Sequence, residues 1–580
     1  MSFYTDASLV LIPSGIKDQK VYCAKPIDGS ADLTFSRASN ATRVNSSGLV
    51  EKVRTNEIPY SQDFDNAQWS KDGNGTGVTP LVTANNATAP DGTLTADTIV
   101  FDAGAGTTTG DSSVVYQSIT ATGLCTASFY ARVTSGSGQL VFRSVGGSWY
   151  TTANLTTTWQ RFSAAENGSS GFFEIGIRRG LSNEPINASV TAELWGAQLE
   201  TGDIATDYIA TTSSAVRVGP VSGLPRLDYS GGASCPSLLL EPERTNLVPY
   251  SEQLVDTNYP SSYNITSVQN SSVSPDGYTN ADTLSLTNTG LPYGFLAKTI
   301  NGQAAGSYTF SVFAKAGTTD YAFLQIYVNL DPTPNRDAYF NLANGSVEST
   351  LNCTASIEDY GSGWYRCIVT TTTSATYNLD VVFQPSIASS RSTTGNAIFW
   401  GAQLEAGAYA SSYIPTLSTA VTRVKDVALT ASVPSLIGQT EGTLYAEMTR
   451  ESLAESFFMI LSDIAGTTAL AYYNSIYIFQ LPNANFVSDC FISNVAQYNF
   501  SYPSGLSVGT HKIALAYKQN DFALYIDGVQ IATDTSGNLP TMNYFTVGGG
   551  ADVTGHKNLI NQTLLFKTRL SNADLATLTA

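Results

Sequence analysis

The chain has 580 residues, of which 42% are hydrophobic and only 13% charged, and 29 Lys and Arg against 47 Asp and Glu give a formal net charge of −18. The hydrophobic share is enough for packed cores and excludes a disordered chain. The acidic balance argues against binding to nucleic acid or to anionic lipid, because both need a basic surface. Thr, Ser, Asn, 48 Gly and 31 Tyr take the place of charged residues, and they favour strands and tight turns. We therefore expect an all-β protein of several domains.

Residues 1–53 show neither a signal peptide nor a core of their own. The start of the chain lacks a basic region, and its apolar stretch Leu9–Pro13 is too short for a secretory signal. No window approaches 18 consecutive apolar residues, so we expect no transmembrane helix and no membrane insertion. Brief apolar runs between Gly, Ser and Pro are typical of an extended segment that packs on its neighbours.

An internal repeat organises most of the chain. Arg54-Thr-Asn-Glu-Ile-Pro-Tyr-Ser61 returns as Arg244-Thr-Asn-Leu-Val-Pro-Tyr-Ser251, and Trp195-Gly-Ala-Gln-Leu-Glu200 returns unchanged at 400–405. Further matches lie between them in the same order: Trp69 with Tyr259, Pro90-Asp-Gly92 with Pro275-Asp-Gly277, Ala96-Asp-Thr98 with Ala281-Asp-Thr283, Ser128–Arg132 with Ser311–Lys315, and Trp159-Gln-Arg161 with Trp364-Tyr-Arg366. The drift of the offsets places an insertion of about 22 residues before Trp364 in the second copy. We predict a duplicated domain, 54–218 and 244–426, joined by a connector at 219–243.

The copies and the C-terminal unit 427–580 show strand patterns typical of β-sandwiches. Thr126–Val133 and Tyr308–Lys315 alternate apolar with small or polar residues, which is the period of a strand with one buried face. In the C-terminal unit His511–Lys518 alternates in the same way, and Asp527-Gly528 marks a hairpin. Ser571, followed by Asp574, is placed to cap a short terminal helix. We expect two related sandwiches followed by a third, larger one.

Several of these motifs carry a family resemblance. The segments concerned are Thr34–Val44, Gly48–Glu51, Arg54–Asn56, Pro59–Ser61, Pro225–Gly232, Cys235–Asn246 and the two Trp-Gly-Ala-Gln-Leu-Glu runs. They resemble recurrent modules of tailed-bacteriophage virion proteins, notably fibre and receptor-binding proteins. The resemblance implies that the two copies are jelly-roll, carbohydrate-binding-like modules. Gly509–Tyr517 followed by Leu524–Val529 is similar to a concanavalin A-like (laminin G-like) sandwich.

The resemblance also implies a function. We expect a tail- or head-fibre-like virion surface protein, made in the host cytoplasm, that attaches to host-surface glycans by multivalent weak binding. Its partners would be other virion proteins and a host glycan. We expect a homo-oligomer, a trimer, in which residues 1–53 attach the protein to the virion or to its own copies. The alternative is a purely structural capsid or tail decoration protein that binds no glycan. A polysaccharide hydrolase is a third hypothesis.

Sugars are bound by aromatic faces together with Asp, Asn and backbone groups. In 427–580 the candidates for a glycan site lie between strand-like runs or after the glycines 548–550: Tyr472, Tyr473, Asn474, Tyr477, Asp552 and His556. The competing interpretation is that these tyrosines pack on the sandwich and the glycines only form a turn.

The other residues singled out by the repeat have structural explanations beside functional ones. The matched Asp97 and Asp282 could bind Ca²⁺, the only cofactor we consider, or accept turn N–H groups. Four matched tryptophans are expected to be structural and to pack in the core: Trp159, Trp364, Trp195 and Trp400.

We expect no enzymatic activity. The two histidines, His511 and His556, have no second His or Cys at metal-ligand spacing, and surface positions are the default for both. Neither a short-period β-helix repeat nor an evident carboxylate pair is present, although carboxylates distant in sequence can meet in space. Cys353 and Cys367 could face each other across a hairpin, but cytoplasmic assembly favours reduced thiols.

Overall fold

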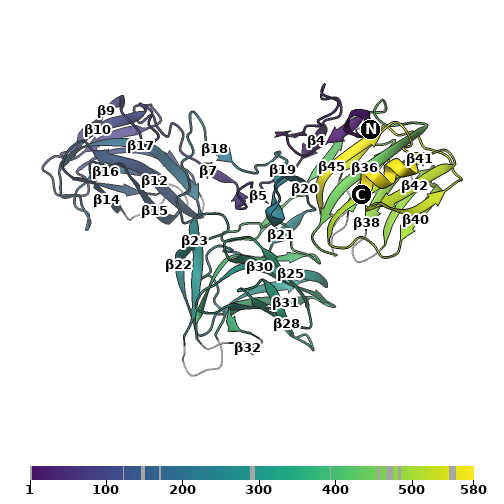
Figure 1. Cartoon of the computed structure of the whole chain (residues 1–580). Helices are drawn as coiled ribbons and strands as arrows, with labels where there is room; N and C mark the ends of the chain where they lie inside the picture. The colour runs from purple at the N-terminus through teal and green to yellow at the C-terminus, as the bar shows by residue number, and fades with distance from the viewer. Residues whose placement is uncertain are drawn as a thin grey trace. The chain divides into compact units, whose positions relative to one another are not determined.

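The structure is a computed structural model. It describes every residue except 1–2, 122, 145–149, 169–170, 288–293, 389, 392–393, 431, 454–456, 466–473, 481–484 and 548–556. Regular structure in the described part is almost entirely β, and its helical elements are α1 (Phe3–Asp6), the 3-10 turn η1 (Ser230–Gly232) and α2 (Asn572–Thr579). The predicted all-β fold class is therefore confirmed (Figure 1). The chain forms two compact units, Val53–Gly219 and Met1–Lys52 with Pro220–Ala580.

The unit Val53–Gly219 is a jelly-roll-like sandwich of two antiparallel sheets. Its strands are β7 (Arg54–Asn56), β8 (Ser70–Asn74), β9 (Val78–Ala87), β10 (Ala96–Asp102), β11 (Ser112–Ile119), β12 (Gly123–Val133), β13 (Gly138–Arg143), β14 (Thr151–Leu155), β15 (Gln160–Gly168), β16 (Gly171–Arg178), β17 (Ser189–Thr201) and β18 (Val216–Val218). One sheet has the order β15-β12-β17-β10-β9, the other has the order β14-β13-β16-β11-β8, and β7 pairs with β18. The apolar side chains between the sheets, including Phe129 and Phe142, form one core.

The second sandwich has the same architecture with an addition. Its strands are β21 (Arg244–Asn246), β22 (Ile265–Val273), β23 (Thr279–Leu286), β24 (Leu296–Gln303), β25 (Gly306–Ala316), β26 (Tyr321–Val328), β27 (Asn335–Asn341), β28 (Ser346–Leu351), β29 (Thr354–Asp359), β30 (Trp364–Thr373), β31 (Tyr377–Ile387), β32 (Ser390–Arg391), β33 (Asn396–Ala406) and β34 (Val421–Arg423). The sheets run β22-β23-β33-β25-β30-β29 and β24-β31-β26-β27-β28, with β32 on β31. The insertion predicted before Trp364 forms β28 and β29, and β29 lies at the edge of its sheet.

The third sandwich takes strands from three parts of the chain. They are β1 (Leu9–Leu11), β2 (Ile16–Lys17), β3 (Lys20–Val21), β4 (Leu33–Ser36), β19 (Arg226–Asp228), β20 (Ser237–Leu240), β35 (Val427–Thr430), β36 (Glu441–Arg450), β37 (Phe457–Ser462), β38 (Ser475–Gln480), β39 (Phe486–Ile492), β40 (Val495–Tyr502), β41 (Gly509–Lys518), β42 (Asp521–Ile526), β43 (Val529–Asp534), β44 (Tyr544–Val547) and β45 (Asn558–Phe566). One sheet runs β19-β20-β45-β36-β41-β42-β43 with β1 on β45, and the other runs β2-β3-β4-β35-β44-β37-β38-β39-β40.

Residues 1–36 and 226–240 are therefore parts of the third sandwich, although their sequence pattern indicated an attachment segment and a connector. Leu9 lies opposite Leu565, and Phe35 lies opposite Ala428. In Figure 1 the N-terminal residues, drawn in purple, run beside the yellow C-terminal strands. Leu9 and Phe35 are also buried in the same core as Leu515.

The local predictions for residues 509–580 are confirmed. β41, β42 and β43 follow one another in the sheet, and Asp527-Gly528 forms the predicted hairpin turn, with φ of 48° and 80°. The Ser571 side chain accepts a hydrogen bond from the Asp574 backbone N–H at the start of α2. A further hairpin of β5 (Thr42–Val44) and β6 (Val50–Lys52) packs on the second sandwich.

Candidate functional site

The repeated Arg-Thr-Asn and Trp-Gly-Ala-Gln-Leu-Glu motifs form a buried polar clamp in each sandwich. The Asn56 amide donates to the carbonyl oxygens of Ala197 and Ile209 at 3.0 and 2.8 Å. Asn246 donates to Ala402 and Ile414 in the same way, at 3.1 and 2.8 Å. Because a buried amide must find such partners, these repeated letters are explained by the fold and do not indicate a ligand site.

The matched aspartates hold backbone turns. Asp97 accepts the N–H groups of Phe64 and Asn85, both at 2.8 Å, and Asp282 accepts those of Leu254 and Asn270 at 2.7 and 2.9 Å. Of the two roles considered for these residues, the structure shows the N–H acceptor. Burial raises the pKa of Asp97 to about 6. Among the described residues no group of three or more His, Cys, Asp or Glu could hold a metal ion.

Three of the four matched tryptophans are buried: Trp195, Trp364 and Trp400 are 4%, 3% and 0% exposed. Trp159 is half-buried, and its indole N–H donates to the carbonyl of Thr88 at 3.0 Å. Trp364 donates in the same way to Val273 at 3.1 Å.

The candidate sugar-binding residues fall into two groups. Tyr472, Tyr473, Asp552 and His556 lie outside the described residues. Asn474 holds a turn, because its amide donates to Asp463 at 2.8 Å and its oxygen accepts the Ser493 N–H at 3.1 Å. Tyr477 is buried in β38, stacks on Phe491 and donates to Asp489 at 2.6 Å. The structure thus packs Tyr477 against the sheet and does not bring it to an open surface.

His511 is buried, contrary to the expected surface position, and lies between Asp527 and Ser507. Its Nδ1 is 2.7 Å from an Asp527 carboxylate oxygen. Its Nε2 is 3.0 Å from the Ser507 carbonyl oxygen and 3.2 Å from the Ser507 hydroxyl. These contacts tie the turn before β41 to the Asp527-Gly528 hairpin.

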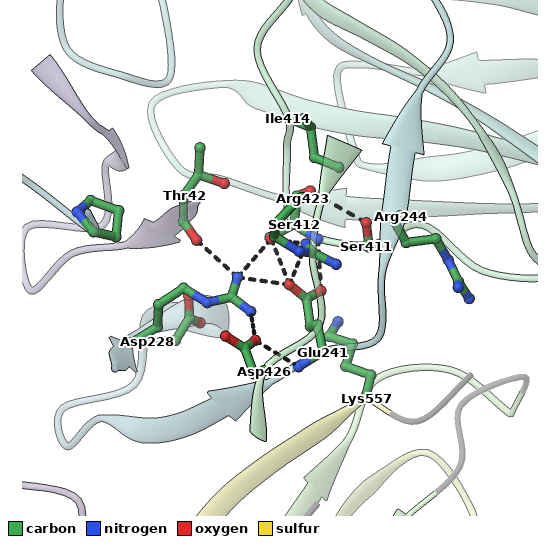
Figure 2. A network of polar contacts seen from close by, with 12 residues as sticks. Thr42, Asp228, Glu241, Arg244, Ser411, Ser412, Ile414, Arg423, Asp426 and Lys557 are labelled. Atoms are coloured by element: carbon green, nitrogen blue, oxygen red, sulfur yellow. Dashed lines mark hydrogen bonds and ion pairs between the residues drawn. The ribbon is translucent and has the colours of Figure 1, made fainter. Parts of the chain in front are cut away.

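A buried ion network joins the N-terminal segment, the connector and the second sandwich to the start of β35 (Figure 2). The Glu241 carboxylate receives the guanidinium groups of Arg226 and Arg423 at 2.7 and 2.6 Å. Asp426 pairs with Arg226 and, at 3.0 Å, with Arg37. All five side chains are at most 4% exposed. Since a buried charge is tolerated only when it is paired, these ion pairs fix the relative placement of four chain segments.

Next to this network, a cleft of about 1140 Å³ opens between the second sandwich and the third. One wall is the edge strand β29 with the turn that follows it, and the other is the outer face of β36 and β45. Polar side chains of the cleft come from elements far apart in sequence, and they include Asp228, Glu358, Tyr360, Arg366, Glu447, Thr449, Glu451, Lys557, Asn561 and Gln562.

The wall formed by the third sandwich is a ladder of hydrogen-bonded side chains. Gln562 donates to Glu447 at 2.9 Å, and Asn561 donates to Thr449 at 3.2 Å. Glu451, at the end of this wall, pairs with Lys557 and accepts the Ser230 hydroxyl at 3.1 Å. The partners hold these groups in place, and amide, hydroxyl and carboxylate groups together present both donors and acceptors to the cleft.

The opposite wall has perturbed ionisation. Burial in the recess, reinforced by the nearby Glu451, raises the pKa of Glu358 above its ordinary value. Burial also raises the pKa of Tyr360, next to which Glu358 lies. Across the cleft, burial raises the pKa of Asp228, which lies on β19 in the sheet of β45 and β36. Perturbed carboxyl groups in a concave site are typical of functional sites. The tyrosine ring beside them supplies an apolar face.

None of these cleft residues was among the sequence candidates. Glu358 and Tyr360 lie on or next to β29, which belongs to the insertion in the second copy. The insertion was visible as an offset in the repeat, and it is the one sequence signal that points to this wall. Asp228 and Gln562 reach the cleft through strand pairings that no local pattern reveals.

Each cysteine is a free thiol. Cys367 lies opposite Ile357 in the β29–β30 pair, so it does not face Cys353 across the hairpin. The Cys353 thiol instead contacts the carbonyl oxygen of Asp337 at 3.2 Å.

Comparisons with known proteins leave the family open. No protein-family model matches the chain, and no curated protein matches its sequence. Among solved structures, Trypanosoma rangeli sialidase aligns with 11% identity over 97% of this chain and 98% of its own, at a TM-score of 0.22. The LG1-3 region of the laminin α2 chain aligns with 9% identity over 79% and 96%, at 0.20. The SAP-like pentraxin of Limulus polyphemus aligns with 9% identity over 24% and 70%, at 0.19. At such TM-scores these alignments support no functional argument.

None of the described helices is both long and apolar enough to cross a membrane.

Proposed function

We propose that this chain is a virion surface protein of a tailed bacteriophage that attaches to host-surface glycans, and that the cleft between the second and third sandwiches binds the glycan. The observation that carries the proposal is the cleft itself. It is larger than the roughly 300–1,000 Å³ typical of pockets for drug-sized ligands, so an oligosaccharide of several sugar units fits its size.

The groups on the cleft walls suit sugar recognition. Asn561, Thr449 and Gln562 offer fixed donors and acceptors for hydroxyl groups, and the ring of Tyr360 offers an apolar surface for the C–H face of a sugar. The phage origin, the fibre-like role, the trimeric state and the location in the virion are supported by the sequence motifs. Within this proposal the protein binds the glycan and does not cleave it, and weak single sites gain strength from several copies on one particle.

The test is binding of the full-length protein to a glycan array and to host cells. Gln562→Ala and Thr449→Ala remove one wall group each and are expected to weaken glycan binding several-fold, because each takes a donor or acceptor from the ligand. The control is Gln519→Ala, which removes an exposed amide in the turn between β41 and β42, outside the cleft. Equal binding by all variants would reject the cleft as the site. The lack of saturable binding to any glycan or host cell would instead favour the purely structural decoration protein.

Cleavage is tested separately. Host capsule or lipopolysaccharide incubated with the protein is expected to release no reducing ends. Released oligosaccharide, abolished by Glu358→Gln, would replace the binding proposal with a hydrolase in which Glu358 is the proton donor.

A further inference from the structure

The hairpin formed by β5 and β6 docks on the second sandwich through an apolar contact and two ion pairs. Val50 is 4% exposed and packs with Trp364, Trp400 and Tyr413. The Lys52 ammonium lies 2.5 Å from Glu252, 3.0 Å from Asp276 and 5.6 Å from the centre of the Trp400 ring. Burial lowers and the two carboxylates raise the pKa of Lys52, and the carboxylates prevail, so the docked lysine carries its charge.

The hairpin also contacts the backbone of one turn. The Val50 N–H donates to the carbonyl oxygen of Pro275 at 2.9 Å. Leu49 lies against Gly277, where an added Cβ would come within 3.0 Å of its Cδ1 atom. We call this docking surface the hairpin site of the second sandwich; it consists of the turn Pro275–Gly277 and the rings of Phe313, Trp364, Trp400 and Tyr413.

The first sandwich contains the same surface, its own hairpin site, formed by the turn Pro90–Gly92 and the rings of Tyr130, Trp159, Trp195 and Tyr208. Its geometry repeats closely. The Trp195 ring is 4.5 Å from Tyr208 and 5.4 Å from Tyr130, and the matching distances from Trp400 to Tyr413 and Phe313 are 4.7 and 5.3 Å.

The two hairpin sites differ in what covers them. Phe313, Trp364 and Tyr413 are at most 3% exposed under the hairpin, whereas their counterparts Tyr130, Trp159 and Tyr208 are only partly buried. The position of Gly92 shows the difference directly, because a Cβ there would meet no described atom within 4 Å. Among the described residues of Val53–Gly219, no side chain takes the place that Leu49 has on the second sandwich.

The charges of the open site define its partner. Asp91 corresponds to Asp276 and is exposed, with the N–H and hydroxyl of Thr93 as its hydrogen-bond donors. These bonds lower the pKa of Asp91, so its carboxylate is charged. Gln62 stands in place of Glu252, which leaves one carboxylate where the second sandwich has two. Arg132, which stacks 4.8 Å from the Trp159 ring, is neutralised by Glu193 at 2.5 Å.

We propose that the hairpin site of the first sandwich is a docking surface for a β-hairpin of another virion protein. The partner hairpin presents two adjacent aliphatic side chains at its turn, followed by a single lysine or arginine that pairs with Asp91. The chain's own hairpin is held on the second sandwich by Val50 and by both ion pairs of Lys52, and a second copy of the chain holds its hairpin in the same way. A different protein is therefore the occupant. This inference does not depend on the proposed glycan site, but the assignment of the partner to the virion rests on the proposed function.

The probe is a cyclic peptide with the sequence of residues 42–52, titrated into the full-length protein by calorimetry. We expect saturable binding of one peptide per chain, because the second sandwich is already occupied. Asp91→Asn is expected to weaken binding about two- to five-fold, the range for one exposed ion pair, and Trp159→Ala is expected to abolish it. Asp91 is exposed, so its variant tests the site even if Trp159→Ala unfolds the sandwich. A peptide with Ser at the positions of Leu49 and Val50 is expected not to bind.

Matched variants in the second sandwich provide the control. Asp276→Asn is expected to leave the one-to-one peptide binding unchanged. If this variant lost binding while Asp91→Asn kept it, the peptide would be exchanging with the chain's own hairpin on the second sandwich. That result would overturn the proposal. No binding at millimolar peptide would also overturn it. Self-association of the protein that Asp91→Asn abolishes would identify a second copy as the occupant, and loss of glycan binding in Trp159→Ala would identify a sugar site. Either result contradicts the partner proposed here.

Discussion

The buried ion network around Glu241 allows a quantitative test of how the larger unit is held together. Glu241→Gln keeps the shape of the side chain but removes its charge. The Glu241 Oε2 atom accepts Arg226 and Arg423 at 2.7 and 2.6 Å and the Ser412 hydroxyl at 2.6 Å, and Oε1 accepts the Ser412 N–H at 2.8 Å. The neighbouring guanidinium groups hold the pKa of Glu241 well below its ordinary value. The variant therefore leaves the three buried guanidinium groups of the network with Asp426 as its one remaining carboxylate.

Removing one partner of a buried ion pair lowers the free energy of unfolding by about 3–5 kcal/mol. The unit that contains Glu241 has about 400 residues, for which the entropy of unfolding is roughly 0.85 kcal/mol/K. A loss of about 4 kcal/mol in the free energy of unfolding then lowers the midpoint of thermal unfolding of this unit by about 5 °C. Differential scanning calorimetry should show this shift in the transition of the larger unit, while that of Val53–Gly219 stays in place. The control is Glu348→Gln, an exposed position on β28 in the same unit. A shift no larger than that of the control would refute the claim that the network stabilises this unit.

Four further outcomes follow from the structure. Asn56→Ala is expected to destabilise only Val53–Gly219, and Asn246→Ala only the larger unit. Each should lower the free energy of unfolding by about 1–3 kcal/mol, because each leaves two buried carbonyl groups without their hydrogen-bond donor. Urea unfolding followed by a probe in each unit checks this. Burial raises the pKa of Asp97 to about 6, so between pH 4 and 6 the native state holds a proton that the unfolded state has lost. The free energy of unfolding of Val53–Gly219 should therefore fall by up to about 3 kcal/mol as the pH rises from 4 to 6. In Asp97→Asn this free energy should depend less steeply on pH. Removal of residues 1–36 is expected to abolish cooperative melting of the larger unit and to increase binding of a hydrophobic dye; an unchanged melt would contradict the strand pairing of β1 and β4. Because Asp97 and Asp282 hold backbone N–H groups, chelation with EDTA should leave both transitions unchanged; a lower midpoint would show that a metal stabilises one of them.

The sequence predicted well what local patterns encode. The alternation over His511–Lys518 and the Asp527-Gly528 turn located β41 and its hairpin, because a strand with one buried face alternates apolar with polar residues along the sequence. The repeat located both jelly-roll sandwiches, since the Asn56 and Asn246 clamps tolerate few other side chains.

What the sequence did not show depends on pairing between distant segments. β1 has three residues and joins β45, where Leu9 lies opposite Leu565, and so short a strand has no recognisable period. The cleft is hidden for the same reason, because Glu358 and Gln562 meet only after the sandwiches are assembled. For Tyr477 aromatic character was a poor guide, since its ring stacks on Phe491 and its hydroxyl is bound by Asp489.

The third sandwich has a consequence for how the protein is made. Strand β45 pairs with β1, β20 and β36, so β1 leaves the ribosome long before its partner β45 is synthesised. The unit Val53–Gly219 has no such delay, because all its strands lie in one continuous stretch of the chain. Translation that stops early would thus release a finished first sandwich flanked by unpaired, apolar N-terminal strands, a species that cellular proteases would recognise and remove.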